Sequence, residues 1–280
     1  MKAYSRWFIP LMLMAALAGC SSTSFMYKRA DMLVAWYVDD YVELDRQQSQ
    51  QLDRLLRPVL DWHQQQELPR YSAIVAAAEQ FLDEDISNKE LQQLTADVDQ
   101  AIARLRQRSL DWVLPLAASL NERQVAELLT NMEKEQADRT SDYLERDEDE
   151  YRKDIYERIH KPMRRYLGRL SARQRDQLQL AITEMVRMDS LYLQDQAAWI
   201  ERLRLILQRQ PGWQQRLRQA VETRWENATE QYRQSYSHNY NIVQMAVVKL
   251  INGRTRQQDK HLRRELERLQ EELNELSRPS

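Results

Sequence analysis

The sequence predicts an all-α fold: an elongated bundle of about seven or eight helices, several of them long and kinked at proline. Glycine is scarce, with 4 residues in a chain of 280, which leaves little room for tight turns and hairpins. Long stretches repeat apolar residues at helical spacing and show no strand-like alternation. The chain is also strongly hydrophilic on average, which fits thin, elongated packing with much helix surface in water.

A recurring nine-residue pattern marks where helices are expected to begin. Its four copies are LDRQQSQQL from Leu44, ISNKELQQL from Ile86, LNERQVAEL from Leu120 and LSARQRDQL from Leu170. In each copy a short polar residue can cap the helix, and a Gln or Glu three positions later can reach back to the cap's own N–H group, which makes a capping box. Each cap contributes about 1 kcal/mol, so starting a helix is enough to explain the repetition.

These starts and the apolar runs between them define the expected elements. In order, the expected helices are Phe25–Leu44, Asp45–Glu67, Pro69–Glu84, Asn88–Ser119, Asn121–Leu167, Ala172–Gln208, Pro211–Asn252 and Arg256–Ser277. Pro58, Pro115 and Pro162 lie inside helical patterns and predict kinks. The dipeptide Leu68-Pro69 predicts a break, because a residue before proline avoids the helical region. Met32–Val38 is apolar on every side, which predicts burial against several neighbours.

The N-terminus has the features of an export signal. Lys2 and Arg6 precede the apolar run Trp7–Leu17, which is too short for a membrane span of about 20 residues. The run ends in LAGC, which resembles the bacterial lipobox. The resemblance implies cleavage between Gly19 and Cys20 and attachment of acyl chains such as palmitate to Cys20; the alternative is an ordinary secretory signal that happens to contain a cysteine. We therefore expect a signal peptide over residues 1–19, a lipidated tether over 20–24 and a single helical periplasmic domain over 25–280.

The residues after Cys20 suggest a location. Multi-chain acylation gives stable anchoring, and Ser21 stands where inner-membrane retention signals usually have Asp. We therefore expect the protein in the inner leaflet of the outer membrane, facing the periplasm, with its membrane contact made through the N-terminal lipid. Cys20 is the only cysteine, so the mature domain can have no disulfide.

Composition argues against several classes of function. Without the predicted signal peptide the chain has 39 basic against 43 acidic residues, so it lacks the basic stripe that nucleic-acid binding requires. No glycine-rich phosphate loop, G-x-S-x-G motif or free cysteine nucleophile is present. The histidines lie far apart in sequence, at His63, His160, His238 and His261. We therefore expect no metal, no cofactor and no small-molecule substrate, and we interpret the protein as a non-enzyme.

Asp39 and Asp40, flanked by Trp36 and Tyr37, form the most site-like cluster. Paired carboxylates can perform acid–base chemistry when their pKa values differ, but adjacent helical residues point about 100° apart. The pattern favours a salt bridge to an arginine on another helix, and the four residues are retained as a candidate interaction surface.

Two periodic stripes can be either surfaces or seams. Trp225, Tyr232, Tyr236 and Tyr240 form an aromatic stripe that can anchor a peptide or pack as a helix seam; the seam is favoured. A leucine heptad marks the last expected helix, at Leu262, Leu266, Leu269, Leu273 and Leu276. Its short length favours docking on the protein's own body over dimerisation.

Two resemblances accompany these patterns. The segments WYVDDYVELDRQQSQQL, LDWHQQQELPRYSAIV and RRYLGRLSARQRDQL resemble an uncharacterised family of proteobacterial outer-membrane lipoproteins, a domain of unknown function. That family implies lipoprotein status and helical architecture and supplies no site residues. LSARQ and LNERQ, with Gln174 and Gln124, resemble the LTxxQ element of the Spy and CpxP periplasmic chaperones, which also opens helices.

The expected function is that of a structural or interaction protein, anchored to the outer membrane and presenting helical surface to envelope proteins. The alternative is a chaperone-like module that binds unfolded periplasmic or outer-membrane proteins.

Overall fold

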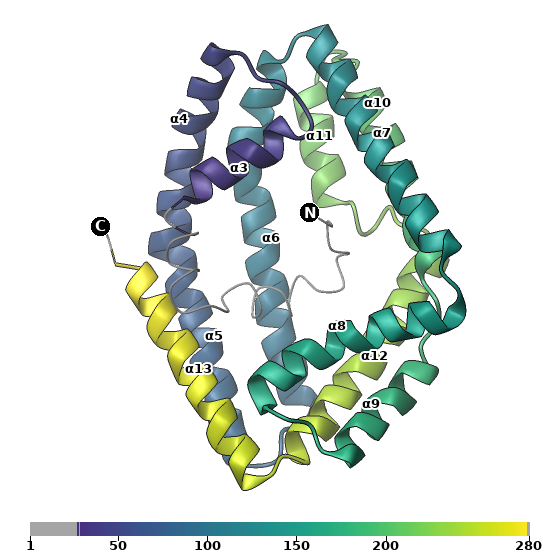
Figure 1. Ribbon diagram of the computed structural model, residues 1–280. Coiled ribbons are helices and arrows are strands. Elements are labelled where there is room, and N and C mark those ends of the chain that lie inside the picture. Colours follow the sequence, from purple (N-terminus) through teal and green to yellow (C-terminus); the bar gives the residue numbers. More distant parts are fainter. Residues whose placement is uncertain (1–26, 28, 279–280) are drawn as a thin grey trace.

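The computed structural model describes residues 27 and 29–278, and its elements in that part of the chain are all helical (Figure 1). The α-helices are α3 Ala30–Asp39, α4 Arg46–Trp62, α5 Leu68–Gln80, α6 Asn88–Ser119, α7 Glu122–Glu145, α8 Glu148–Leu167, α9 Ala172–Thr183, α10 Asp189–Ile206, α11 Trp213–Glu222, α12 Glu230–Asn252 and α13 Arg256–Leu276. A π-helical turn, η2 His63–Glu67, joins α4 to α5, and a 3₁₀ turn, η3 Phe81–Asp83, follows α5. The expected signal peptide, Gly19 and Cys20 lie outside the described residues.

The helices are arranged as an elongated frame (Figure 1). One long side consists of α4 and α5 in line, with α13 packed along α5 and α6 packed behind both. The opposite side is the pair α7 and α10, and α8, α9 and α12 close one end. The short helix α3 crosses the front and packs on α4.

The all-α class is confirmed, but the expected count of seven or eight helices is too low. Three expected helices are each interrupted: Asn121–Leu167 at Arg146, Ala172–Gln208 after Thr183, and Pro211–Asn252 after Glu222. At the first break Asp147 is extended and caps α8 with a capping box, a signal hidden in a run of charged residues. Pro58, Pro115 and Pro162 lie within continuous helices.

The four helix starts predicted from the nine-residue pattern are confirmed. Capping boxes with both hydrogen bonds are present at Asp45, Ser87, Asn121 and Ser171. Thr255 makes a further box at the start of α13. The sequence pattern missed Thr255, because Arg254 stands there where the other copies have an aliphatic residue.

Two of the capping glutamines, Gln48 and Gln124, also bind each other across 76 residues of sequence. Each side-chain amide donates to the other's oxygen, at 2.9 and 2.7 Å. Gln48 Nε2 also donates to the Ser119 carbonyl and Gln124 Nε2 to the Glu43 carbonyl, at 2.9 and 2.8 Å. Each oxygen accepts a second bond from its own cap N–H group, at 3.0 Å. These buried amides are therefore fully satisfied, as burial of polar groups requires.

Gln174 and Gln258 repeat this arrangement at the far end of the frame. Their amides bind each other reciprocally at 3.3 and 3.0 Å, and each also donates to a backbone carbonyl, of Leu250 and Arg169 respectively. One glutamine pair therefore joins the starts of α4 and α7, and the other joins the starts of α9 and α13.

The expected break at Leu68-Pro69 is absent, because the extra residue of the π-helical turn η2 accommodates the proline within a continuous helix. The Leu68 N–H group donates to the His63 carbonyl, five residues back, and Pro69 occupies the first turn of α5. Proline is tolerated in the first turn of a helix, where its missing N–H group is not needed. The chain therefore remains helical from Arg46 to Gln80.

The leucine heptad lies in the protein's own core. All five of its leucines are at most 6% exposed, and they share a core cluster with residues of α5, α8, α9 and α12. Docking on the body, rather than use as a free dimer seam, is confirmed. No helix in the described part of the chain is both long and apolar enough to cross a bilayer.

Candidate interaction surface

Helix α3 presents its largest aromatic side chains to solvent. Trp36 is 60% and Tyr37 58% exposed, whereas Val38 is buried in a core cluster shared with α4 and α6. At about 100° per residue, Asp39, Trp36, Asp40 and Tyr37 fall within an arc of about 160° on one side of the helix. The expectation that this segment is buried on every side is therefore wrong, because α3 crosses the frame and one of its sides has no neighbour among the described residues (Figure 1).

The end of α3 is held by polar contacts with α7. The Tyr41 hydroxyl donates to Glu135, and Asn131 Nδ2 donates to the Tyr41 carbonyl at 2.9 Å. Burial, and then the hydrogen bond to Glu135, raise the pKa of Tyr41 well above its usual value. The Tyr37 ring lies edge-on to the Tyr41 ring, with 5.3 Å between centroids. The exposed Trp36 and Tyr37 are therefore carried by a helix whose end is fixed against α7.

Asp39 and Asp40 accompany Trp36 and Tyr37 on this surface. Both carboxylates are exposed, and neither forms an ion pair with another of the described residues. The favoured salt bridge to an arginine on another helix is thus not present there. The result is an acidic, aromatic patch, which we call the α3 patch (Trp36, Tyr37, Asp39 and Asp40).

The aromatic stripe of α12 is a packing seam. Tyr232 is 3% exposed and lies in a core cluster with residues of α10. The Trp225 ring is 4.9 Å from that of Tyr236, which stacks on Tyr240 with 6.0 Å between centroids. Of the candidate surface residues, those of α3 are therefore available to a partner and Tyr232 is not.

The π-helical turn places a buried acid that the sequence did not reveal. Glu67 is 0% exposed; its Oε1 lies 2.8 Å from Arg104 Nε and 2.5 Å from Arg70 Nη1, and its Oε2 accepts from Arg104 Nη2 at 2.8 Å. Burial raises the pKa of Glu67, but the hydrogen bonds from Arg104 and Arg70 outweigh burial and hold the pKa below its usual value. With both oxygens engaged, Glu67 is suited to fixing α5 against α6 rather than to proton transfer.

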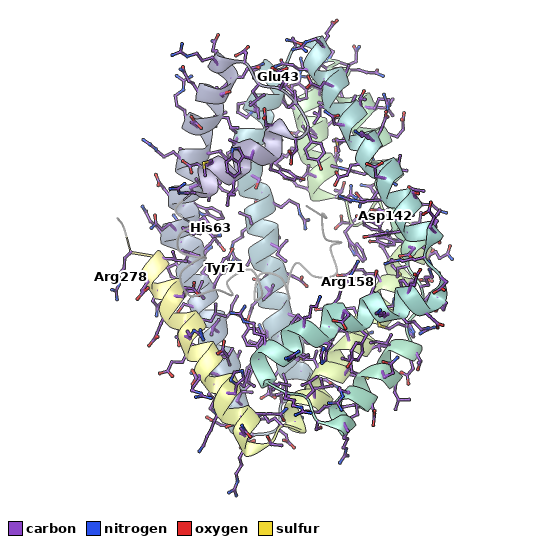
Figure 2. All side chains as sticks on the ribbon, in the orientation of Figure 1. Glu43, His63, Tyr71, Asp142, Arg158 and Arg278 are labelled. Atoms are coloured by element: carbon purple, nitrogen blue, oxygen red, sulfur yellow. The ribbon has the colours of Figure 1, made fainter. Side chains whose placement is uncertain are left out.

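His63 and Tyr71 lie on the same side of the frame, opposite Asp142 and Arg158 (Figure 2). His63 Nδ1 is hydrogen-bonded to the Tyr27 hydroxyl at 2.9 Å, and the Tyr71 ring is 5.5 Å from the His63 ring. Burial lowers the pKa of His63, against a smaller raising effect of Glu67. Burial also raises the pKa of Tyr71 to about 12.

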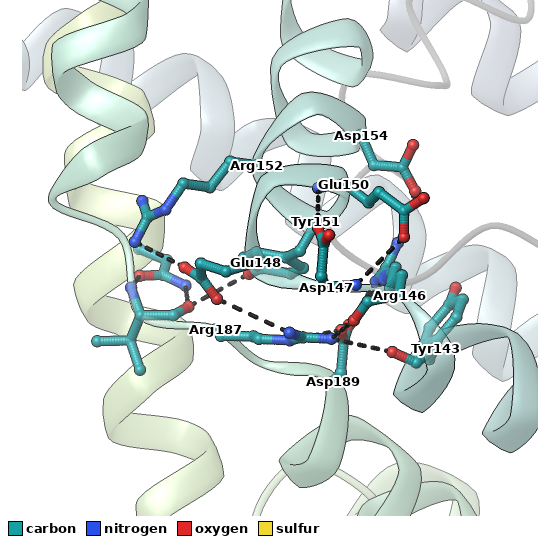
Figure 3. A network of polar contacts seen from close by, with 12 residues as sticks. Tyr143, Arg146, Asp147, Glu148, Glu150, Tyr151, Arg152, Asp154, Arg187 and Asp189 are labelled. Carbon is teal, nitrogen blue, oxygen red and sulfur yellow. Dashed lines mark hydrogen bonds and ion pairs between the residues drawn. The ribbon is translucent and has the colours of Figure 1, made fainter.

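A second buried acid, Asp189, fixes the corner where α7, α8, α9 and α10 meet (Figure 3). Its carboxylate lies 2.5 Å from Arg146 Nη2 and 3.0 Å from Arg187 Nε. The Arg146 guanidinium also stacks over Tyr143, 4.4 Å from the ring centroid, and pairs with Asp154 at 2.6 Å. The acids and arginines of this corner are mutually paired, which is typical of a structural junction rather than a catalytic centre.

The histidines do not assemble into a metal site. No group of three or more His, Cys, Asp or Glu residues in the described part of the chain could hold a metal ion. The His238 and His261 rings instead contact backbone carbonyls, of Glu184 and Arg165.

Comparison with known proteins gives a family and no activity. A family model described as "Family of unknown function (DUF6279)" matches residues 40–233, more than half of the chain. No curated protein and no solved structure matches the chain. The resemblance to an uncharacterised family is confirmed at this level, and the lipoprotein character of that family stays a prediction.

Proposed function

The chain belongs to the DUF6279 family of unknown function, and we propose from its own residues that it is an outer-membrane-anchored periplasmic lipoprotein of the interaction type, without catalytic activity. The observation that carries the interaction role is the exposure of Trp36 and Tyr37 on a fixed helix. Isolated exposed apolar residues are ordinary, but adjacent Trp and Tyr side chains on a braced support are typical of interface anchors.

The proposed anchor puts this surface near the membrane. In the sequence, Cys20 precedes the start of α3 at Ala30 by ten residues, which span at most about 36 Å when fully extended. The α3 patch would therefore face partners that lie at or close to the bilayer. We extend the proposal to the family, as a group of proteobacterial outer-membrane lipoproteins.

The acids of α3 favour a protein partner over the lipid surface itself. Asp31, Asp39 and Asp40 are all exposed on this helix, and carboxylates are repelled by anionic lipid headgroups. A protein surface with Arg or Lys around an apolar socket complements the patch better.

The chaperone-like alternative draws less support. The glutamines that resemble the LTxxQ element, Gln124 and Gln174, are 2% exposed and bonded to other glutamines, so they cannot reach a client protein. Of the large apolar side chains that are exposed elsewhere in the described residues, Leu144, Leu180, Leu205 and Met245 each lie on a different helix, and Val186 lies between α9 and α10. A chaperone would be expected to present a contiguous apolar patch.

The proposal is tested by site-specific photocrosslinking in intact cells. A photoreactive phenylalanine analogue at Tyr37 is expected to give a discrete protein adduct, and the same analogue at exposed Leu180 on α9 serves as the matched control. Adducts with lipid alone, or equal adducts at both positions, would contradict a protein-binding role for α3. The anchor is tested separately: with residues 1–19 replaced by an ordinary cleavable secretory signal, the processed Cys20→Ser protein should be in the soluble fraction, whereas the protein with its own signal and Cys20 should stay with the membrane.

A further inference from the structure

A partly open cavity of about 190 Å³ lies where α5, α6, α8, α12 and α13 converge. Its wall includes Val98, Ile155, Ile159, Val243, Val247 and Leu266. Packed protein interiors contain few voids larger than a water molecule, so a space of this size within the main core cluster is unusual.

The chemistry of the wall selects an apolar occupant. No Asp, Glu, Lys or Arg side chain lines the cavity, and nearly all of the exposed wall is carbon. A buried water needs two to four polar partners, whereas an apolar cavity of roughly 150 Å³ stays dry and takes up benzene. The space is thus suited to hydrocarbon rather than to water or a charged metabolite.

The cavity is long, which favours a chain over a ring. On α8 its lining runs from Ile155 to Leu167, and on α12 from Tyr240 to Ile251. The two stretches correspond to about 18 and about 16 Å of helix at 1.5 Å per residue. An extended hydrocarbon chain fits such a slot, and a compact ring system would leave much of its length empty.

A small group of uncharged polar side chains also borders the slot. Gln244 Nε2 donates to Thr95 Oγ1 at 3.1 Å, and the Tyr240 hydroxyl beside them is buried without a hydrogen bond of normal geometry to any described residue. These three residues, with Tyr166, carry the hydrogen-bonding side chains of the lining. They suit the carbonyl of an ester or a protonated acid.

We propose that this cavity binds a single acyl chain of a lipid. The proposal does not depend on the partner assigned to α3, because it uses a different part of the frame. The acyl chain can belong to a phospholipid or to a free fatty acid, and the two sources share the chemistry that the wall recognises.

The test uses the full mature protein in phosphatidylethanolamine–phosphatidylglycerol vesicles. One arm contains a phosphatidylethanolamine with a diazirine in its acyl chain, and the other contains a diazirine fatty acid. After illumination, adducts are expected on peptides from α8 and α12 that contain Ile159 and Val247. The arm that gives them identifies the source of the chain.

Two cavity-filling variants and one control separate binding from surface labelling. Ala78→Phe and Val247→Phe fill the slot from different helices and are expected to reduce cavity adducts by at least about tenfold, equivalent to 1.4 kcal/mol of binding. Each should melt at the same temperature as wild type or higher, since it fills a void. Ala137→Phe, at an exposed position of α7, should label as wild type. Absence of cavity adducts in both arms, or adducts that persist in folded filling variants, would overturn the proposal.

Discussion

A buried glutamine amide has two donors and an oxygen that accepts two bonds, and at Gln48, Gln124, Gln174 and Gln258 all of these are used. No single helix can supply that many partners. Each glutamine accepts one bond from its own helix start, exchanges two with its counterpart and donates one to a backbone carbonyl of another segment. An ordinary helix cap thereby becomes a junction between helices that are distant in sequence.

The first prediction concerns Gln124. Replacing it with Ala should lower the free energy of unfolding by about 2–4 kcal/mol, because the Gln48 amide is left buried without its partner and the cap of α7 is weakened. Urea unfolding measures the change. Glu90→Ala is the matched control, since Glu90 occupies the same capping position at Ser87 but makes no such pair; it should cost about 1 kcal/mol or less. Equal losses in the two variants would show that the pair adds nothing to the cap.

At the scale of the element, the π-helical turn η2 departs from what the local sequence rule for proline predicts. An X-Pro dipeptide ordinarily ends a helix, yet here the extra residue of the π turn accommodates Pro69 and Glu67 is directed onto Arg104. π-Helical turns are uncommon and often occur at functional positions. In this protein the turn fixes α5 against α6 and carries His63 into a half-buried place.

The second prediction concerns pH and His63. Burial lowers the folded-state pKa of His63 below its usual 6.5, so the unfolded chain binds the proton first as the pH falls. The free energy of unfolding should therefore decrease as the pH drops from about 6.5 toward the folded-state pKa. His63→Gln cannot titrate and should flatten this part of the profile, measured by urea unfolding at several pH values. His238→Gln, at an exposed position, should leave the profile unchanged; a wild-type profile with no slope below pH 6.5 would contradict the prediction.

Much of this element-level description follows from the sequence, and the exceptions have physical causes. The caps at Asp45, Ser87, Asn121 and Ser171 were predictable because capping depends on residues three positions apart. The pairing of the capping glutamines depends on contacts 76 and 84 residues apart, which no local pattern encodes. The candidate residues on α3 were identified by their composition, but their exposure depends on how α3 crosses the frame.

At the scale of the whole molecule, α13 completes the structure by packing on α5 and α8. Leu273 is 0% exposed in this contact, and Ser72 on α5 donates to Asn274 Oδ1 at 2.9 Å. Helix α13 thus covers α5, a helix that comes much earlier in the sequence.

The third prediction tests that contact with a cysteine pair. In the double variant Ser72→Cys, Asn274→Cys, mild oxidation should give an intramolecular disulfide, detected as a faster-migrating monomer on a non-reducing gel. The single variant Ser72→Cys should show no such shift, and its mobility provides the reference. A disulfide-linked dimer as the main product of the double variant would indicate that α13 is exchanged between two chains.

The contacts of Gln64 extend the same connection to the end of the chain, since its amide donates to the carbonyls of Leu276 and Arg278 at 2.8 and 3.0 Å. A chain is synthesised from its N-terminus, so these carbonyls are made more than two hundred residues after Gln64. Until these residues are synthesised, α5 lacks the helix that covers it and Gln64 lacks both of its carbonyl acceptors. The α5 side of the frame therefore gains this cover only after residues more than two hundred positions further along have been made, and removal of α13 removes it.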